Sequence, residues 1–156
     1  MTSPGVDVTF GSNVRAVHHL LLDTRNSGSH LFNMGYGLQL NDNGNVTVSA
    51  YCLGGNTIPV YMYAMVSESP EPISGTEVTD TKSGALPSGT ELNIDITSSG
   101  KIKSIDSISL SITNNSTRSY HPFLEVYINN PYTIRVRIQQ ASDATEQYTI
   151  TVKYKV

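Results

Sequence analysis

Charged residues are scarce in this sequence. Only 15% of its 156 residues are Asp, Glu, Lys or Arg, against roughly 25% in an average soluble domain. Ten basic and 13 acidic side chains leave a net charge of -3. Such a chain has no positive field to gather phosphates, so nucleic acid is not an expected partner. No segment approaches the ~20 apolar residues of a membrane-spanning helix, so membrane insertion is not expected either.

Cysteine is almost absent. Cys52 is the single thiol, so it cannot form an internal disulfide, and its place in an apolar, alternating segment predicts a buried, unreactive side chain. The first residues contain neither the basic nor the apolar region of a signal peptide. These features favour a protein that assembles in a host cytoplasm. A secreted or cell-surface protein whose leader has been removed is the alternative.

The patterns of catalytic and metal sites are missing too. His18 and His19 are adjacent, so on a strand they would point to opposite faces and could not bind one metal ion. Segment 41–45 has the Asp, Asn and Gly of a calcium loop but only one carboxylate, and it favours a hairpin turn. There is no Gly-x-Ser-x-Gly elbow and no glycine-rich phosphate loop. We therefore expect no enzyme, no metal and no other cofactor.

Alternation of apolar and polar residues is abundant instead. With a period of two, it predicts antiparallel strands that have one solvated face. The polar positions draw on 19 serines, 16 threonines and 12 asparagines. Short strands joined by turn clusters predict an all-β fold, an antiparallel β-sandwich of jelly-roll or Greek-key type with about nine or ten strands. We expect one domain, 1–156. The clearest alternating segments are 92–96, 108–112, 124–128, 132–138 and 148–156.

Two segments are less regular. Residues 14–22 are compatible with a short helix, but the three consecutive leucines at its end favour a buried strand. Residues 67–89 contain several prolines and acidic side chains and few large apolar ones. We predict a long loop there, with at most one short strand near 76–80. Loops of this length are usually functional or ordered by a partner.

Aromatic residues suggest where the protein makes contacts. The chain has nine tyrosines and no tryptophan, and segment 58–66 is apolar on both faces. Such a strand lies either in the centre of a sandwich or against a neighbouring subunit. Tyrosine and methionine are enriched at protein–protein interfaces. The predicted interface residues are Tyr61, Met62, Tyr63 and Met65.

Two polar clusters are candidates for ligand binding. Their amide, hydroxyl, guanidinium and phenol groups suit a shallow sugar site, in which a tyrosine ring stacks on the sugar. For the larger cluster, an ordinary hairpin loop is the alternative interpretation. The larger cluster contains Asn114, Asn115, Arg118 and Tyr120, and the smaller one Asp23, Arg25 and Asn26.

These observations favour a non-enzymatic structural or assembly protein. We expect a homo-oligomer, with a trimer favoured, that is a surface component of a virus or phage particle of the decoration-protein or fibre-head type. Its partners would be copies of itself and a capsid or fibre protein, and it would lie on the virion surface after assembly. The alternative is a carbohydrate-binding, lectin-like module for receptor binding or adhesion, with a glycan as its ligand. This functional prediction follows from composition and fold class, since no motif carries it.

Overall fold

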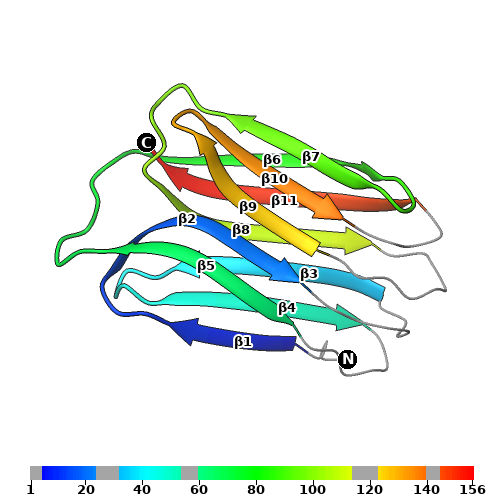
Figure 1. Cartoon of the computed structure of the whole chain (residues 1–156), viewed down its shortest axis with the longest axis horizontal. Coiled ribbons are helices and arrows are strands. Elements are labelled where there is room, and N and C mark those ends of the chain that lie inside the picture. The colour runs from blue at the N-terminus through cyan, green and yellow to red at the C-terminus, as the bar shows by residue number, and fades with distance from the viewer. Residues whose placement is uncertain (1–4, 24–31, 54–59, 114–122, 140–144) are drawn as a thin grey trace.

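The computed structural model describes residues 5–23, 32–53, 60–113, 123–139 and 145–156 (Figure 1). Every regular element in these residues is a β-strand, so the all-β prediction is confirmed, with eleven strands in place of nine or ten. The strands are β1 (Gly5–Phe10), β2 (Val14–Asp23), β3 (Phe32–Leu40), β4 (Val46–Leu53), β5 (Tyr61–Glu68), β6 (Glu77–Leu86), β7 (Glu91–Thr97), β8 (Ser104–Thr113), β9 (Phe123–Asn130), β10 (Thr133–Gln139) and β11 (Glu146–Lys155).

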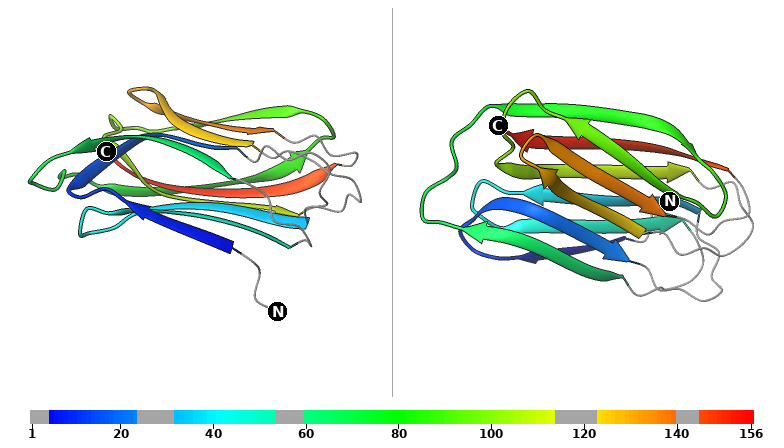
Figure 2. Two further views of the ribbon diagram at one scale, coloured as in Figure 1. Left: turned by 60° about the horizontal axis from the view of Figure 1, so that its bottom comes forward. Right: turned by 45° about the horizontal axis from the view of Figure 1, so that its top comes forward.

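The strands form two antiparallel sheets that pack face to face as a sandwich (Figures 1 and 2). Sheet A has six strands in the order β1-β4-β3-β8-β11-β6, and sheet B has five in the order β5-β2-β9-β10-β7. Among the described strands, only β3 with β4 and β9 with β10 are pairs of consecutive strands. The other connections cross between the sheets, as in Greek-key and jelly-roll sandwiches.

The core lies between the sheets and follows directly from the alternation in the sequence. On β11, every second side chain points inward and is buried, while the intervening threonines and lysines face outward. Full burial of one large aliphatic side chain contributes about 1.5–3 kcal/mol, so the two inner faces hold the sandwich together. The inward residues of β11 are Glu146, Tyr148, Ile150, Val152 and Tyr154.

The hairpin between β3 and β4 is confirmed. Asn41 and Asn45 pair through a backbone hydrogen bond of 2.8 Å, and the amide of Gly44 donates to the Asn41 carbonyl at 2.9 Å. Gly44 has a φ of 83°, which favours glycine, and a Cβ there would come within 2.7 Å of the Asn13 nitrogen. The strand prediction for 14–22 is confirmed as well, because β2 spans this segment.

The prediction of one long loop over 67–89 is wrong. β5 continues to Glu68, and β6 pairs with β11 along ten residues. β6 lies at an edge of sheet A and therefore needs few large apolar side chains. Its hydroxyl groups bond across to β11 instead, with Oγ1–Oγ1 2.9 Å between Thr81 and Thr151. Only the connections 69–76 and 87–90 remain outside strands.

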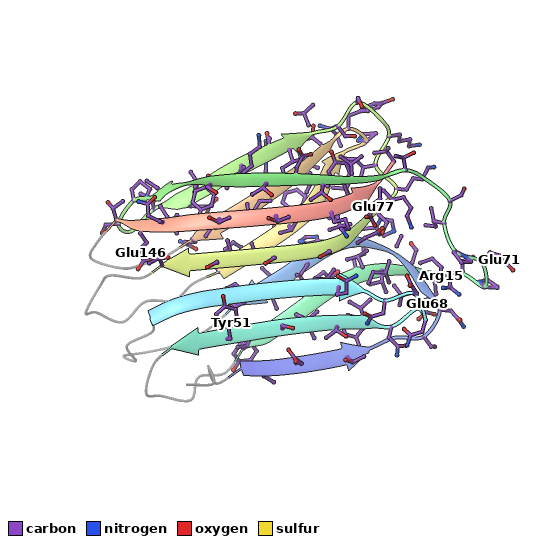
Figure 3. All side chains as sticks on the ribbon, turned by 180° about the vertical axis from the view of Figure 1, so that it is seen from behind. Arg15, Tyr51, Glu68, Glu71, Glu77 and Glu146 are labelled. Carbon is purple, nitrogen blue, oxygen red and sulfur yellow. The ribbon has the colours of Figure 1, made fainter. Side chains whose placement is uncertain are left out.

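The connection 69–76 is held at its start by Arg15 of β2 (Figure 3). The Arg15 guanidinium donates from Nε to the Ser69 carbonyl at 3.0 Å and from Nη2 to the Pro70 carbonyl at 3.2 Å. The amide of Ser69 also donates to the carbonyl of Asn13 at 3.0 Å. These bonds fix the path by which the chain leaves sheet B and enters sheet A.

Candidate functional site

The predicted interface residues lie on β5, which is an edge strand of sheet B and pairs only with β2 among the described strands. The alternative of a central strand is therefore wrong. Tyr61, Tyr63 and Met65 point outward and are 52%, 51% and 49% exposed. Met62 points inward, opposite the buried Leu22, yet it is 37% exposed. All four side chains are accessible to a partner.

Neighbouring strands extend the apolar surface of β5. The His19 ring on β2 packs edge-on to Tyr63, with ring centroids 5.8 Å apart, and tilts toward Tyr127 on β9 at 5.3 Å. Leu21 lies opposite Tyr63 on the same outer face. We call this surface the aromatic patch, and it consists of Tyr61, Tyr63, Met65, His19, Leu21 and Tyr127.

Sequence reasoning missed three members of the aromatic patch. His19, Leu21 and Tyr127 occupy outward positions on their strands, where most strands of this chain carry a serine, threonine or charged residue. An apolar or aromatic residue at such an outward position was the signal in the sequence that could have pointed to these members of the patch. That the three lie together could not be inferred, because it depends on the pairing of β2 with both β5 and β9.

Charged side chains border the aromatic patch on the β9 side. The carboxylate of Glu125 lies 3.8 Å from the buried His19 Nε2, which makes no hydrogen bond among the described residues. On its other side, Glu125 lies 3.3 Å from Arg137 Nη1, and Arg137 Nε donates to Glu91 at 3.1 Å. The Arg137 guanidinium also stacks over the ring of Phe123, 5.4 Å from its centroid.

The far half of the same face is ionic. Arg135 donates to both carboxylate oxygens of Asp95, at 2.7 and 2.8 Å. Hydrogen bonds from Arg135 lower the pKa of Asp95, and those from Arg137 lower the pKa of Glu91. These pairs are exposed, so they stabilise the fold little. The outer face of sheet B is thus apolar on β5, β2 and part of β9, and ion-paired on β10 and β7.

Of the predicted ligand-binding residues, only Asp23 lies in the part of the chain that the structure describes. It sits at the end of β2, opposite Tyr61 on one side and Phe123 on the other. The predicted sugar cluster and the predicted interface therefore meet at this residue. The other six lie outside the described residues: Arg25, Asn26, Asn114, Asn115, Arg118 and Tyr120.

The larger polar cluster lies outside the described residues, so its hairpin alternative stays a prediction. Segment 114–122 follows β8 of sheet A and precedes β9 of sheet B, and these strands do not pair. β9 begins beside the end of β2, since Phe123 is the partner of Asp23. Both predicted polar segments, 24–31 and 114–122, therefore attach to neighbouring strands at the same end of sheet B (Figure 1).

The outer face of sheet A has a different character. Viewed from that side, its strands carry mostly short side chains (Figure 3). Hydroxyl groups pair across neighbouring strands, so much of their hydrogen-bonding capacity is used within the sheet. The pairs are Thr9 with Thr47 at 3.1 Å, Thr81 with Thr151 at 2.9 Å and Ser83 with Thr149 at 3.1 Å. Among the described residues, the large apolar side chain exposed on this face is Tyr51 of β4, at 40%, so the face offers less apolar surface than the aromatic patch.

Within the described residues, no group of three or more His, Cys, Asp or Glu side chains could hold a metal ion. No helix in this part of the chain is long and apolar enough to cross a membrane. The side chain of Cys52 on β4 is outside what the structure describes, so its burial stays a prediction. No family model, no curated protein and no solved structure matches the chain.

Proposed function

We propose that this protein is a non-enzymatic assembly protein that binds protein surfaces through the aromatic patch. In this proposal it is a homo-oligomeric surface component of a virus or phage particle, of the decoration-protein or fibre-head type. The observation that carries the proposal is the exposure of Tyr61, Tyr63 and Met65 side by side on an edge strand.

The composition of this face supports the proposal. Large exposed rings and a methionine offer much contact area at a low cost in conformational entropy, which is why such residues are enriched at interfaces. The ion-paired residues around Arg137 border the aromatic patch on one side. An apolar centre with a polar margin is the usual anatomy of a protein–protein contact.

A carbohydrate ligand is the second candidate, and one observation favours it. Tyr61 and the carboxylate-bearing Asp23 are cross-strand neighbours at the end of sheet B to which both polar segments attach. A ring for stacking and a carboxylate for hydrogen bonds are the few directed groups that a shallow sugar site needs. Glycan binding that Tyr61→Ser and Asp23→Asn abolish, in a protein that stays monomeric, would support this candidate instead.

The assembly proposal predicts that Tyr63→Ser weakens self-association. Native mass from light scattering on a sizing column should be a discrete multiple of the 16.9 kDa chain. Loss of a central interface tyrosine costs about 2 kcal/mol or more, so the dissociation constant should rise about 30-fold. Because Tyr63 is half exposed, the fold itself should remain intact.

Tyr132→Ser is the matched control. Tyr132 is 51% exposed, like Tyr63, but it lies outside the aromatic patch in the turn between β9 and β10. Its replacement should leave the native mass unchanged. A wild-type chain that is monomeric at every concentration, or equal effects of the two variants, would contradict the proposal.

A further inference from the structure

The two sheets are unequal in width, and β1 of sheet A has no strand of sheet B packed against its inner face. Val6 and Val8 of β1 pair with Ala50 and Val48 of β4, which both face the core. Directly paired residues of antiparallel strands point to the same face, so the two valines point inward as well. They are nevertheless 50% and 43% exposed. At this edge, β1 extends beyond sheet B (Figure 2).

The opposite sheet is open at the same side. β5 is the edge of sheet B there, and its inward-facing Met62 remains partly exposed. β5 also carries no proline, lysine or other charged residue before Glu68. We call the surface between β1 and β5 the open side, and it is defined by Val6, Val8 and Met62.

The other side of the sandwich is protected. Its edge strand in sheet A, β6, turns Asp80 and Lys82 inward, since they pair with the inward-facing Val152 and Ile150. Inward-pointing charges on an edge strand are a common device against extension of a sheet by another strand. On the open side, β1 turns no charge inward, and β5 turns none inward before its last residue, Glu68, which pairs with the buried Val14. This side is therefore suited to edge-to-edge contact along most of β5.

We infer that the open side binds a second copy of this chain, with β1 of each copy beside β5 of the other. This inference rests on the proposed assembly function and names its partner. Sheet A projects at the place where sheet B stops short, so a twofold exchange puts each projecting β1 into the space next to the partner's β5. Both sheets then continue across the contact, and the valines of the two β1 strands are covered.

A second copy meets these requirements better than a separate peptide. An added peptide strand would pair with β5 and shield Val8, but it would leave the outer edge of β1 open. Only a partner with the same offset between its sheets can pair with the free edges of β1 and β5 at the same time. Such a self-complementary contact is isologous and closes on two copies, so it predicts an even number of chains in the oligomer, in place of the expected trimer.

The test combines native mass with residue-resolved amide hydrogen exchange. Met62→Lys and Val8→Lys place a charge inside the contact and leave the aromatic patch unchanged. Each should weaken the association about 100-fold and halve the native mass, because an unpaired buried charge is strongly unfavourable. Thr97→Lys, on the β7 edge strand, is the matched control and should change neither quantity. In the wild-type oligomer, all β5 amides should be protected from exchange.

The possible outcomes separate the inference from the proposed function. An even oligomer that both lysine variants halve, together with β5 amides that lose protection in them, would support the open side as the contact. A trimer, or an oligomer in which alternate β5 amides exchange as fast as in the Met62→Lys variant, would overturn the contact and leave assembly through the aromatic patch standing. A wild-type monomer at every concentration would overturn both.

Discussion

At the scale of single residues, Tyr154 illustrates how an edge charge is accommodated. Its ring is buried on β11, and its hydroxyl donates a hydrogen bond of 2.8 Å to Asp80 on β6. Burial, and to a lesser degree the Asp80 carboxylate, raise the pKa of Tyr154. The inward-pointing carboxylate of the edge strand is thus satisfied by a core side chain.

Tyr154→Phe should lower the free energy of unfolding by about 1–3 kcal/mol at neutral pH, because it removes a hydrogen bond to a charged group. It should also change the response to alkali. The raised pKa stabilises the folded wild type fully below the ordinary tyrosine pKa of about 10, and this contribution is lost as pH rises through the folded-state value. Urea unfolding between neutral and strongly alkaline pH measures both effects.

Tyr132→Phe provides the comparison, since the Tyr132 ring is exposed. It should alter neither the stability nor its decline in alkali. If Tyr154→Phe lost stability as steeply as the wild type above the ordinary tyrosine pKa, the proposed role of the buried hydroxyl would be wrong.

Residue-level prediction from the sequence was uneven for a physical reason. The apolar character of Tyr61 and Tyr63 was visible because both faces of one strand were apolar. The contacts of His19 were not, because they require rings from two other strands to lie on either side of it. Which side chains lie next to His19 depends on the strands that pair with β2, and the sequence of β2 alone does not predict those partners.

At the scale of strands, the edge strands of the two sheets differ in how their charges protect them from pairing with other chains. On one side of the sandwich, β7 has ion-paired charges on its outer face and β6 has inward-pointing charges. On the other side, β1 turns no charge inward, and β5 turns none inward before its last residue, Glu68. Since exposed edges invite pairing with other chains, this difference distinguishes the side proposed for assembly from the sides that remain solvated.

Lys82→Val should therefore allow the edge strand β6 to pair with other chains. Lys82 faces inward on β6, opposite Ile150, and it is exposed. A valine there would extend the apolar inner face to an unprotected edge strand and favour pairing with further chains. We expect larger, concentration-dependent species in light scattering, while the fold of the single chain is retained.

Lys101→Val changes the net charge by the same amount outside any strand. It separates the effect of edge protection from that of reduced repulsion. Equal aggregation of the two variants would show that charge alone matters, and would contradict the protective role of Lys82.

Strand positions were largely predictable, and strand partners were not. Alternation identified β8, β9, β10 and β11 because each has one buried and one solvated face. β6 was predicted as at most a short strand near 76–80, because an edge strand can replace apolar residues with threonine and serine hydroxyls that bond across the sheet. The order of the strands depends on connections that cross between the sheets, and the alternation of apolar and polar residues does not predict those connections.

At the scale of the whole molecule, the two proposed contact surfaces have different consequences for assembly. The aromatic patch lies on the outer face of sheet B, whereas the open side lies between the sheets. A chain that uses one isologous contact stops at a dimer, and a chain that uses two different contacts can build larger particles. The sequence predicted an assembly protein, but the separation of these surfaces required the arrangement of the sheets.

Stability should depend on protein concentration if assembly is part of the native state. By mass action, a tenfold increase in concentration stabilises a dimer by about 1.4 kcal/mol, or about 2 °C in the midpoint of thermal unfolding for chains of this length. Scanning calorimetry over a range of concentrations measures this shift. Met62→Lys should reduce the dependence of the midpoint on concentration, and an unchanged dependence in that variant would argue against the open side.

The position of β11 in sheet A also bears on how the chain is made. β6 pairs with β11 alone among the described strands, and β8 needs β11 on one of its two sides. When β6 leaves the ribosome, its partner has not yet been synthesised, and most other pairings are equally distant along the chain. Folding dominated by distant pairings takes roughly milliseconds to seconds. During that interval the nascent sheets display unpaired strands, so chaperones have time to act before the sandwich is complete.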